Sequence, residues 1–539
     1  MGGVISGLGK GITTGSIAKI LQSRGYSVTA VKIDAYVNVD AGTMNPGEHG
    51  EVFVTKDGME TDQDIGNYER FIGTDIPAIN YMTTGLVYKS VIERERNLEF
   101  GGKCVEVVPH VPLEVIRRIK KAAENSKADV TIIEIGGTAG EYQNILFLEA
   151  ARMMKIDSQK DVAFVLVSYL PVPNHLGEMK TKPTQYATRT LNATGIQPDF
   201  IIARSHQRLD LPRMERLALL CNIRPEDIIS NPDVDSIYEI PLLFEEQGLS
   251  EKILKKLDLN LEKQDITEWK KLVHTIKTVS KPIRIGMVGK YFMTGDFMLS
   301  DVYISVIEAL KHAGWNNDVK LEMTWIDSLE FEKDPDSIKS LSKFDGIVVP
   351  GGFGSRGVEG IINAIRYSRE NKIPYLGLCY GMQLAVVEFA RNVAMLNKAH
   401  TTEIDKSTDT PVVHIMSDQE KKLLENNYGG TMRLGNWKCQ LKKNTQAYEA
   451  YFPNGSEEGV IEERHRHRYE INNKYRDILE NKGIVFSGLS IDGNLIEIAE
   501  LPKTDHPFFL ASQFHPEFTS RPLKPNPLFN AFIKACNKD

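Results

Sequence analysis

Cys379 is the residue whose surroundings most clearly suggest chemistry. It stands between Gly377 and Gly381, after an apolar stretch that predicts a strand over 373–376 and before an amphipathic stretch that predicts a helix over 382–388. Glycines on both sides let the backbone bend tightly around the sulfur. The helix start offers N–H groups and a positive dipole end, which favour thiolate over thiol. The pattern predicts a nucleophile, although a buried structural cysteine fits the local sequence equally well.

An imidazole, a carboxylate and a glycine turn elsewhere could complete this chemistry. His515 and Glu517 follow a predicted strand over 508–514, so the carboxylate stands two residues from the imidazole and could orient it. The turn Pro-Gly-Gly-Phe-Gly at 350–354 also follows an apolar run, and it can present backbone N–H groups to an oxyanion. Together the three motifs resemble those of class I glutamine amidotransferase domains over about residues 283–536.

The resemblance implies a role for each of these residues. Cys379 would attack the glutamine amide to give a thioester and free ammonia, with His515 acting as base and then as acid. Glu517 would hold His515, and Gly352 would help form the oxyanion hole. The other glutamine-binding residues implied by the resemblance are Tyr380, Gly381, Met382, Gln383, Glu403 and Arg468.

The N-terminal stretch suggests a phosphate site. The glycine-rich run from Gly2 to Gly11 contains Lys10 and precedes a predicted helix over 13–22, which is the arrangement of a phosphate cradle. It departs from the standard P-loop because Gly11 stands where Ser or Thr would hold magnesium. A predicted strand over 27–34 follows, so a βαβ-type unit is plausible. Taken alone the motif is weak, because glycine-rich termini are often flexible.

Acidic and basic residues further along could complete a nucleotide site. The acid-rich loop 34–73 contains Asp64, and Glu134 ends an apolar stretch that predicts a strand, where ligands bind in open α/β sheets. Such acids are usually only solvated, but after a phosphate cradle they are candidate magnesium ligands. Lys180 and Lys182 suit a triphosphate by charge, although a solvated basic turn explains them as well.

Longer motifs resemble those of CTP synthase, a family of ATP-dependent amidoligases. With the glutaminase motifs they cover nearly the whole chain. They are GGVISGLGKG at 2–11, DxYxNxDxGTM at 34–44, HGEVFVT at 49–55, ETDQDIGNYERF at 60–71, KTKPTQ at 180–185 and RHRHRYE at 464–470. The resemblance implies that UTP, ATP and glutamine give CTP, ADP, phosphate and glutamate. ATP would phosphorylate the uracil 4-oxygen, and ammonia would displace the phosphate.

The resemblance also assigns ligands to residues of the first half. The implied magnesium ligands are Asp64 and Glu134. The implied ATP-binding residues are Gly7, Leu8, Gly9, Lys10, Gly11, Ile12, Lys32, Asp64, Pro232, Asp233 and Val234. The implied UTP- and CTP-binding residues are Ser6, Glu141, Tyr142, Gln143, Lys180, Thr181, Lys182, Pro183, Thr184, Gln185 and Arg216. His49 would line an ammonia path. GTP activation, CTP inhibition and homotetramers that could stack into filaments are further implications.

Some positions depart from the family pattern. Glu141-Tyr142-Gln143 stands where the family usually has Asp-Ile-Glu, and Arg216 where a lysine is common. CTP feedback or base discrimination could therefore differ. Two alternatives stay open: another amidoligase or P-loop ATPase fused to a glutaminase, and a filament subunit that has lost turnover.

Length and composition limit the number of domains, the kinds of partner and the location of the protein. The 539 residues are too many for one core, and 41% hydrophobic and 25% charged residues are ordinary for a globular protein. A net charge of −7 argues against a nucleic-acid partner, and no apolar run approaches the ~20 residues of a membrane span. The five scattered cysteines form no CxxC pair and no signal peptide is evident, which predicts a cytoplasmic enzyme.

We expect an α/β fold with two domains built on mostly parallel sheets. Strand and helix patterns alternate in both halves, whereas the stretch between them is mixed and rich in Lys and Glu. The predicted parts are a P-loop-like synthetase domain over 1–257, a linker over 258–282 and a class I glutaminase domain over 283–539.

The first residues carry one more expectation. In the family that the chain resembles, an apolar strand precedes the glycine loop, whereas here Met1 is followed directly by Gly2 and Gly3. Without that strand, its neighbours would bury N–H and C=O groups without partners, at about 1–3 kcal/mol each. We therefore expect that residues are missing before Met1.

Overall fold

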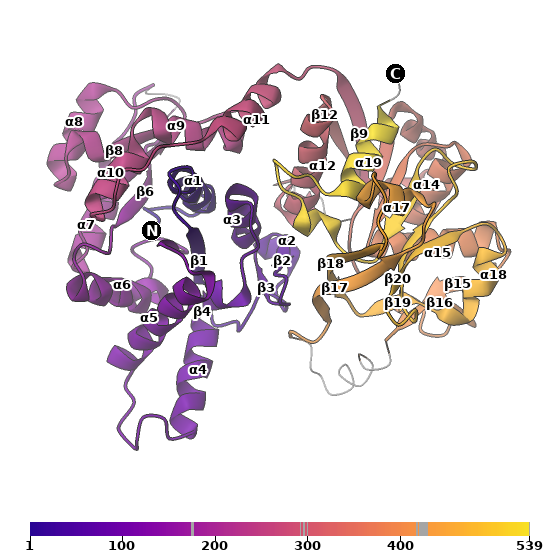
Figure 1. The fold of residues 1–539 in the computed structure, drawn as a ribbon, viewed down its shortest axis with the longest axis horizontal. Coiled ribbons are helices and arrows are strands. Elements are labelled where there is room, and N and C mark those ends of the chain that lie inside the picture. The colour runs from indigo at the N-terminus through magenta and orange to yellow at the C-terminus, as the bar shows by residue number, and fades with distance from the viewer. Residues whose placement is uncertain are drawn as a thin grey trace. The chain divides into compact units, whose positions relative to one another are not determined.

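The computed structural model describes residues 1–173, 177–290, 293–294, 297–298, 300–416, 419 and 429–537. The chain divides into two compact units, one formed by Met1–Ala41 and Asp64–Val273 and the other by Gly42–Gln63 and His274–Asp539. Each unit is an α/β structure with parallel strands and packed helices (Figure 1), so the predicted fold class is confirmed. Residues 42–63 lie inside the first predicted domain but cluster with the second unit.

Two three-stranded parallel sheets form the framework of the first unit, in the orders β4-β1-β5 and β6-β7-β8. The register of β1 places Lys32 opposite Glu134 on β5. The strands are β1 (Val28–Asp34), β4 (Tyr81–Thr83), β5 (Val130–Ile135), β6 (Val165–Tyr169), β7 (Phe200–Ser205) and β8 (Ile228–Pro232). The helices are α1 (Lys10–Gln22), α3 (Asp64–Ile72), α4 (Thr84–Arg96), α5 (Val107–Ser126), α6 (Ile145–Asp157), α7 (Lys182–Ala193), α8 (Leu211–Cys221), α9 (Ile240–Glu246) and α10 (Leu249–Lys256), with α11 (Thr267–Thr278) crossing the boundary between the units.

Helix α1 begins three residues before the predicted start. Gly9 has a left-handed φ of 76°, which ends the loop, and Lys10 becomes the first helical residue. Gly15 lets α1 approach α3, because a Cβ at this position would lie 2.9 Å from the ring of Phe71. Lys10 therefore sits at the N-terminal end of a helix that is fixed by close packing.

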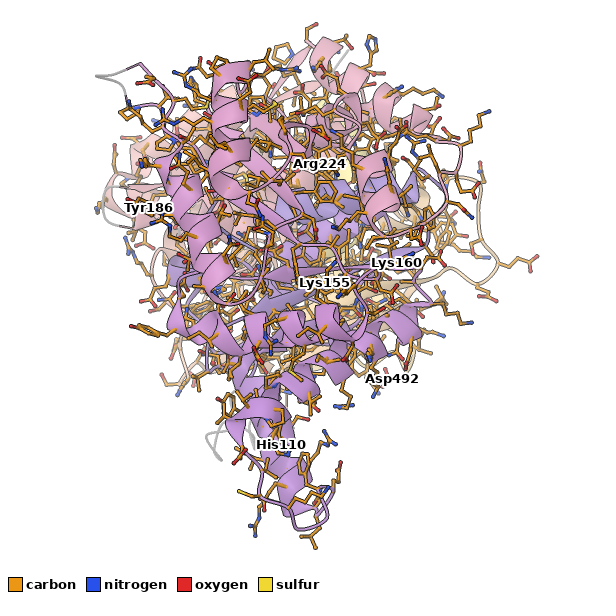
Figure 2. The ribbon with its side chains drawn as sticks, turned by 90° about the vertical axis from the view of Figure 1, so that its left-hand side faces the viewer. His110, Lys155, Lys160, Tyr186, Arg224 and Asp492 are labelled. Atoms are coloured by element: carbon orange, nitrogen blue, oxygen red, sulfur yellow. The ribbon has the colours of Figure 1, made fainter. Side chains whose placement is uncertain are left out.

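Helices α4 and α5 project from the first unit and are joined at the tip by a loop (Figure 1). His110, near the start of α5, lies on this projection (Figure 2), and its ring packs edge-on against Phe100 with 5.3 Å between centroids. Arg94 on α4 donates to the buried carboxylate of Glu114 on α5 at 3.0 Å, which joins the two helices. No helix in the described ranges is both long enough and apolar enough to cross a membrane.

The first residues of the chain lie between β5 and β6. Gly2 pairs with Val167 in parallel, the Gly3 N–H donates to the Val167 carbonyl at 2.8 Å, and the Val167 N–H donates to the Met1 carbonyl at 2.9 Å. On the other side, the Ala139 N–H donates to the Gly2 carbonyl at 3.0 Å. Met1–Gly3 therefore occupy the end of a strand position between the two sheets.

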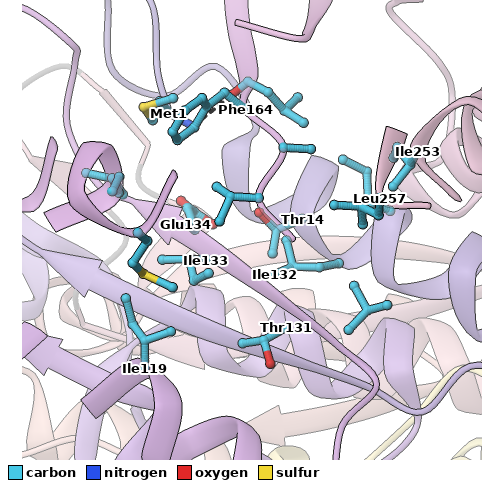
Figure 3. A pocket seen from close by; sticks show the side chains of 18 of the residues that line it. Met1, Thr14, Ile119, Thr131, Ile132, Ile133, Glu134, Phe164, Ile253 and Leu257 are labelled. Carbon is cyan, nitrogen blue, oxygen red and sulfur yellow. Dashed lines mark hydrogen bonds between the residues drawn. The ribbon is translucent and has the colours of Figure 1, made fainter. Parts of the chain in front are cut away.

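The rest of that strand position is a cavity of about 440 Å³ (Figure 3). Its wall is mainly apolar and includes Ile132, Phe164, Ile253 and Leu257. Met1 stands at the cavity, and its amino group donates to the Val165 carbonyl at 3.2 Å. Met1 therefore borders a mainly apolar cavity between β5 and β6.

A nine-stranded sheet forms the framework of the second unit, in the order β12-β9-β13-β14-β22-β21-β20-β17-β18. Pairing is parallel from β12 to β22 and antiparallel from β22 to β18, because the later strands connect as hairpins. The strands of this sheet are β9 (Pro282–Gly289), β12 (Lys320–Asp327), β13 (Gly346–Val349), β14 (Tyr375–Leu378), β17 (Arg433–Leu441), β18 (Val460–His467), β20 (Val485–Ser490), β21 (Ile496–Glu500) and β22 (Phe509–Ser512).

Smaller elements complete the second unit. The short strands are β2 (Val52–Val54), β3 (Glu60–Asp62), β10 (Met293–Thr294), β11 (Phe297–Met298), β15 (Ala399–Thr401), β16 (Thr410–Ile415) and β19 (Tyr469–Ile471). The helices are α2 (Pro46–His49), α12 (Ile304–Asn316), α13 (Leu329–Lys333), α14 (Val358–Glu370), α15 (Tyr380–Asn392), α17 (Gln446–Tyr451), α18 (Arg476–Glu480) and α19 (Pro527–Cys536). Apolar residues of α14, α15 and the central strands form a continuous buried core, which fixes the ends of β13, β14 and β22 relative to one another.

Candidate active sites

Cys379 lies in a strained turn between β14 and α15. Its φ of 49° and ψ of −96° fall in a region that L-residues rarely adopt, at a cost of about 1–3 kcal/mol. The flanking glycines make the turn possible, because a Cβ at Gly381 would lie 2.3 Å from the Val349 carbonyl oxygen. A Cβ at Gly377 would lie 2.9 Å from the Gly381 carbonyl carbon. The structure therefore contains the strand, tight turn and helix expected around Cys379.

His515 and Glu517 lie beside Cys379, where β22 ends. The Nδ1 of His515 is 2.7 Å from Oε1 of Glu517, and all three side chains are buried. Burial opposes protonation of the imidazole, but the charges of Glu517 and Cys379 outweigh it and raise the pKa of His515 to about 10. His515 is therefore an imidazolium at neutral pH, which suits it to pair with a thiolate and to protonate a leaving amine.

The glycine turn after β13 faces the same pair. A Cβ at Gly351 would lie 3.0 Å from Cε1 of His515 and 3.8 Å from Cβ of Cys379. The turn is held at Gly354, whose carbonyl accepts from the Tyr380 hydroxyl at 2.8 Å and whose N–H donates to Glu403 at 2.7 Å. These contacts bring the turn that contains Gly352 next to Cys379.

Lys290 is a second anchor of the same turn that the sequence analysis did not single out. Its Nζ donates to the Gly354 carbonyl and lies 4.4 Å from the centroid of the Tyr380 ring. Burial lowers the pKa of Lys290 to about 8. The available signal was a lysine directly after the apolar strand β9, at the carboxyl end where ligands gather in α/β sheets.

The remaining predicted glutamine-binding residues belong to the same unit as Cys379. Gln383 on α15 donates to the Tyr469 carbonyl at 3.0 Å, and Met382 and Gly381 precede it on the same helix. Burial raises the pKa of Glu403. Arg468 donates to Gln419 at 2.8 Å and to Thr431 at 3.0 Å.

The segment 42–63, from the N-terminal part of the chain, packs against His515 through Phe518. The ring of Phe53 packs edge-on against Phe518 at 4.9 Å, and Phe518 stacks on the His515 ring at 5.1 Å. Arg464 donates to the Val54 carbonyl at 3.0 Å. These contacts explain why residues far from 274–539 in sequence belong to the same unit.

Lys32 is the centre of the candidate site in the first unit. Its Nζ contacts Asp64 and lies 3.1 Å from Glu134 and 3.6 Å from Asp34. Burial opposes ionisation of Asp64, but Lys32 outweighs it and lowers the pKa of that carboxyl. Burial and the charge of Asp64 raise the pKa of Glu134. Three carboxylates thus surround the Lys32 ammonium, with Asp64 and Glu134 closer to it than Asp34.

The predicted phosphate loop, the glycine-rich stretch over residues 2–11, lies against this cluster. A Cβ at Gly11 would lie 1.9 Å from Oδ1 of Asp64, so the position that departs from the standard P-loop has room only for glycine. Lys10 is buried at the start of α1, where the first N–H groups of the helix and its dipole favour an anion. Gly7, Leu8, Gly9 and Ile12 precede or follow it in this turn.

Tyr68 is a buried member of the cluster that the sequence analysis quoted within a motif without assigning it a role. Its hydroxyl donates to Oε2 of Glu134, and burial together with the Glu134 charge raises the pKa of Tyr68 well above its usual value. Asn67 donates to Oδ1 of Asp64 at 3.3 Å. These partners orient both carboxylates.

The predicted UTP residues on α7 lie close to the start of the chain. The hydroxyl groups of Thr184 and Ser168 are 3.0 Å apart, and a Cβ at Gly3 would lie 2.7 Å from Oγ of Ser168. Gln185 donates to Thr181 at 2.9 Å. Lys182 begins the helix, with Pro183 next, and Ser6 lies exposed in the loop. The phosphate loop and the N-terminal end of α7 therefore lie together.

Other predicted nucleotide residues have internal partners. Lys180 forms an ion pair with Glu178 at 2.6 Å. Glu141 accepts from the Thr138 N–H at 2.8 Å and from Gln143 at 2.7 Å, while Tyr142 is 92% exposed.

The predicted adenine segment follows β8. Pro232 ends that strand, and the Asp233 carboxylate contacts Arg204 at 3.0 Å and His206 at 2.9 Å, before Val234. Arg216 is an exposed residue of α8.

The cluster around Lys32 suits a hard divalent cation. Magnesium is usually held by one or two carboxylates together with substrate phosphates and water. Asp64, which is partly buried, and Glu134, which is buried, already share a cationic partner beside the phosphate loop. Within the described residues, no group of three or more His, Cys, Asp or Glu side chains could hold a metal ion. The pair Asp64 and Glu134 itself fits a magnesium ion that takes its other ligands from nucleotide phosphates and water.

Comparisons with known proteins match both parts of the chain. The family model for the CTP synthase N-terminus matches residues 1–259, and that for class I glutamine amidotransferases matches residues 298–535. The CTP synthase of Geobacillus kaustophilus is 47% identical over 540 residues, which is 100% of this chain and 98% of the relative. The CTP synthases of Carboxydothermus hydrogenoformans (49% over 538 residues, 100% and 98%) and Pyrococcus abyssi (48% over 539 residues, 100% and 97%) are similar in the same way. The chain therefore belongs to the CTP synthase family, with an N-terminal synthetase part and a C-terminal glutamine amidotransferase part.

Proposed function

We propose that the two sites divide between them the activity of this family, the glutamine-dependent conversion of UTP to CTP. In the second unit, Sγ of Cys379 attacks the amide carbon of glutamine, the C–N bond breaks, and the His515 imidazolium gives its proton to the departing ammonia. Neutral His515 then takes a proton from water, which attacks the thioester and releases glutamate and the thiolate. The observation that carries this proposal is the buried His515–Glu517 pair, 2.7 Å apart, beside a cysteine on a strained turn.

In the first unit, ATP phosphorylates the 4-oxygen of UTP, and ammonia then displaces phosphate. Lys10 and Lys32 are buried cations at the phosphate loop, where they neutralise charge that develops on the transferred phosphoryl group. Asp64 and Glu134 would hold Mg²⁺, which would supply positive charge to offset that of the ATP phosphates. Asn67 and Tyr68 keep those two carboxylates in place.

The finer assignments rest on the family and on position. His49 lies 3.7 Å from Asp62 in the segment that packs in the same unit as Cys379, which supports a place on the ammonia path. GTP activation, CTP inhibition, tetramers and filaments follow from the family resemblance alone. A cytoplasmic location is supported by the cysteines, none of which is paired in a disulfide in the described ranges.

Replacing the nucleophile separates the two half-reactions. Cys379→Ala should abolish CTP formation from glutamine and leave CTP formation from ammonium intact, because the synthetase site needs only the amine. Cys439→Ala, which removes another buried cysteine of the same unit, is the matched control and should retain both activities. Equal loss with both nitrogen sources in Cys379→Ala would contradict the assignment.

A further inference from the structure

Gln513 is a fully buried polar residue in contact with the nucleophile. It follows β22 and comes two residues before His515. Its side-chain Nε2 lies 3.6 Å from Sγ of Cys379, and its Oε1 lies 3.3 Å from Nε2 of Gln383. Its side chain is 0% exposed. The established motifs give this side chain no role, and an amide buried beside a reactive sulfur calls for one.

The orientation of the Gln513 amide is set by a fixed backbone acceptor. The Tyr469 carbonyl can only accept, so the side chain of Gln383 must turn its Nε2 toward it, at 3.0 Å. The same Nε2 then faces Gln513, whose side chain must present Oε1 to it. The remaining end of the Gln513 amide, Nε2, therefore points at the sulfur and offers an N–H donor.

We propose that Gln513 is a positioning residue for the nucleophile: its amide donates an N–H to Sγ of Cys379, which holds the sulfur in place and stabilises the thiolate. This inference rests on the proposed role of Cys379. Hydrogen bonds to ionised acceptors are about twice as strong as neutral ones, so the donor favours thiolate over thiol. Gln513 also couples the sulfur, through Gln383, to the main chain at Tyr469.

Other groups around the sulfur also influence whether Cys379 is a thiol or a thiolate. His515 faces it as an imidazolium, with Glu517 behind the imidazole. The Arg466 carbonyl lies 3.9 Å from Sγ and can accept from a thiol S–H. The N-terminal end of α15 adds a positive dipole. Gln513 is thus an uncharged donor to the sulfur, whereas the Arg466 carbonyl is an acceptor. Removing the Gln513 N–H should favour the thiol form of Cys379 while leaving its pairing with the His515 imidazolium in place.

The same bond acts when the thioester is cleaved. As water adds and the C–S bond breaks, the electron pair returns to sulfur, and the thiolate again accepts the Gln513 N–H. A better stabilised thiolate is also a better leaving group. Both acylation at neutral pH and deacylation should therefore be slower without the donor.

The test measures the reactivity of the Cys379 sulfur as a function of pH. The rate of Cys379 alkylation by iodoacetamide is followed as a function of pH, with mass mapping of the Cys379 peptide because the exposed Cys104 would react as well. Gln513→Met keeps the length of the side chain and removes the N–H. Ser512→Ala changes the adjacent buried side chain, whose hydroxyl donates to the Phe514 carbonyl, and is the matched control.

We expect Gln513→Met to move the half-maximal pH of alkylation upward by about 0.5 to 1, which corresponds to about 3- to 10-fold slower alkylation below it. The rate at high pH should stay equal or rise, because a more basic thiolate is the better nucleophile. Ser512→Ala should match the unchanged chain at every pH.

An unchanged half-maximal pH in Gln513→Met would overturn the proposal, and so would the same shift in Ser512→Ala. If Gln513→Met unfolds, Gln513→Glu is measured instead. That variant keeps the acceptor for Gln383 and places a carboxyl oxygen at the sulfur, so it should shift the half-maximal pH upward as well. Failure of the underlying assignment looks different, because Cys379→Ala would then retain CTP formation from glutamine.

Discussion

Extending the chain before Met1 with five apolar residues, such as Val-Ile-Val-Ile-Val, should stabilise the first unit. Five residues of strand span about 17 Å, close to the length of the six-residue β5. The parallel bridge between Gly2 and Val167 sets the register in which such a segment enters the cavity between β5 and β6. The added residues would pair with both edges and fill the space of about 440 Å³.

Packing of the extension contributes the first part of the effect. Burying each apolar side chain is worth about 1.5–3 kcal/mol, and ordering each residue costs about 1.5 kcal/mol. Five residues then raise the free energy of unfolding by between about 0 and 7 kcal/mol, with about 3 kcal/mol as a central value. For a unit of this size such a gain raises Tm by about 6–12 °C.

The N-terminal ammonium makes a second contribution to the change in stability, and this contribution depends on pH. Burial, with help from Lys10, lowers the pKa of the Met1 amino group from 8.0 to about 5. The unfolded chain therefore binds more protons than the folded chain between pH 5 and 8, so stability rises with pH across this window and is lost as the pH falls. Relative to a pH well above 8, the free energy of unfolding is lower by about 1.4 kcal/mol at pH 7 and by about 4 kcal/mol below pH 5. An extension removes this ammonium from the cavity.

Three chains separate the two contributions: the unextended chain, the apolar extension, and a Ser-Gly extension of equal length. Thermal unfolding is recorded from pH 5 to pH 8, and ATP affinity is measured by calorimetry. Both extensions should flatten the pH dependence of Tm, but only the apolar one should add the packing gain and tighten ATP binding, because it supports the phosphate loop. Equal Tm values for the two extensions at every pH would refute the reasoning about the cavity.

Further outcomes test the sites themselves. Glu134→Ala and Asp64→Ala should each lower CTP formation at least 100-fold with either nitrogen source while glutaminase turnover persists, because these residues act before amine attack; an active Glu134→Ala variant with ammonium would remove it from the proposed metal site. Glu517→Gln should lower the pKa of His515 from about 10 and reduce glutaminase kcat/KM at least tenfold with ammonium-dependent synthesis unchanged, and a pH–rate profile like that of the unchanged chain would contradict the pairing. Gly351→Ala should also impair only the glutaminase, since its Cβ would lie 3.0 Å from the His515 ring, and full glutamine-dependent activity would argue against a close approach of this turn.

The sequence by itself determined the local chemistry of both sites. The turn at Cys379 could be predicted because its two glycines and the flanking apolar runs act within a few residues, where backbone sterics decide the conformation. The pairing of His515 with Glu517 was predictable for the same reason, since two residues separate them. The motifs along the chain were specific enough to indicate the family that the comparisons then showed.

Only the tertiary structure decided which distant residues meet. Lys32 meets Glu134 because the parallel register of β1 and β5 places positions 102 residues apart opposite each other, and the start of α3 brings Asp64 to the same ammonium. Segment 42–63 packs in the second unit, and the amide of Gln513 points at Cys379 through contacts that no spacing rule specifies. Sequence patterns report the conformation of neighbouring residues, whereas these contacts depend on how whole strands and helices pack, so they appear only when the chain is folded.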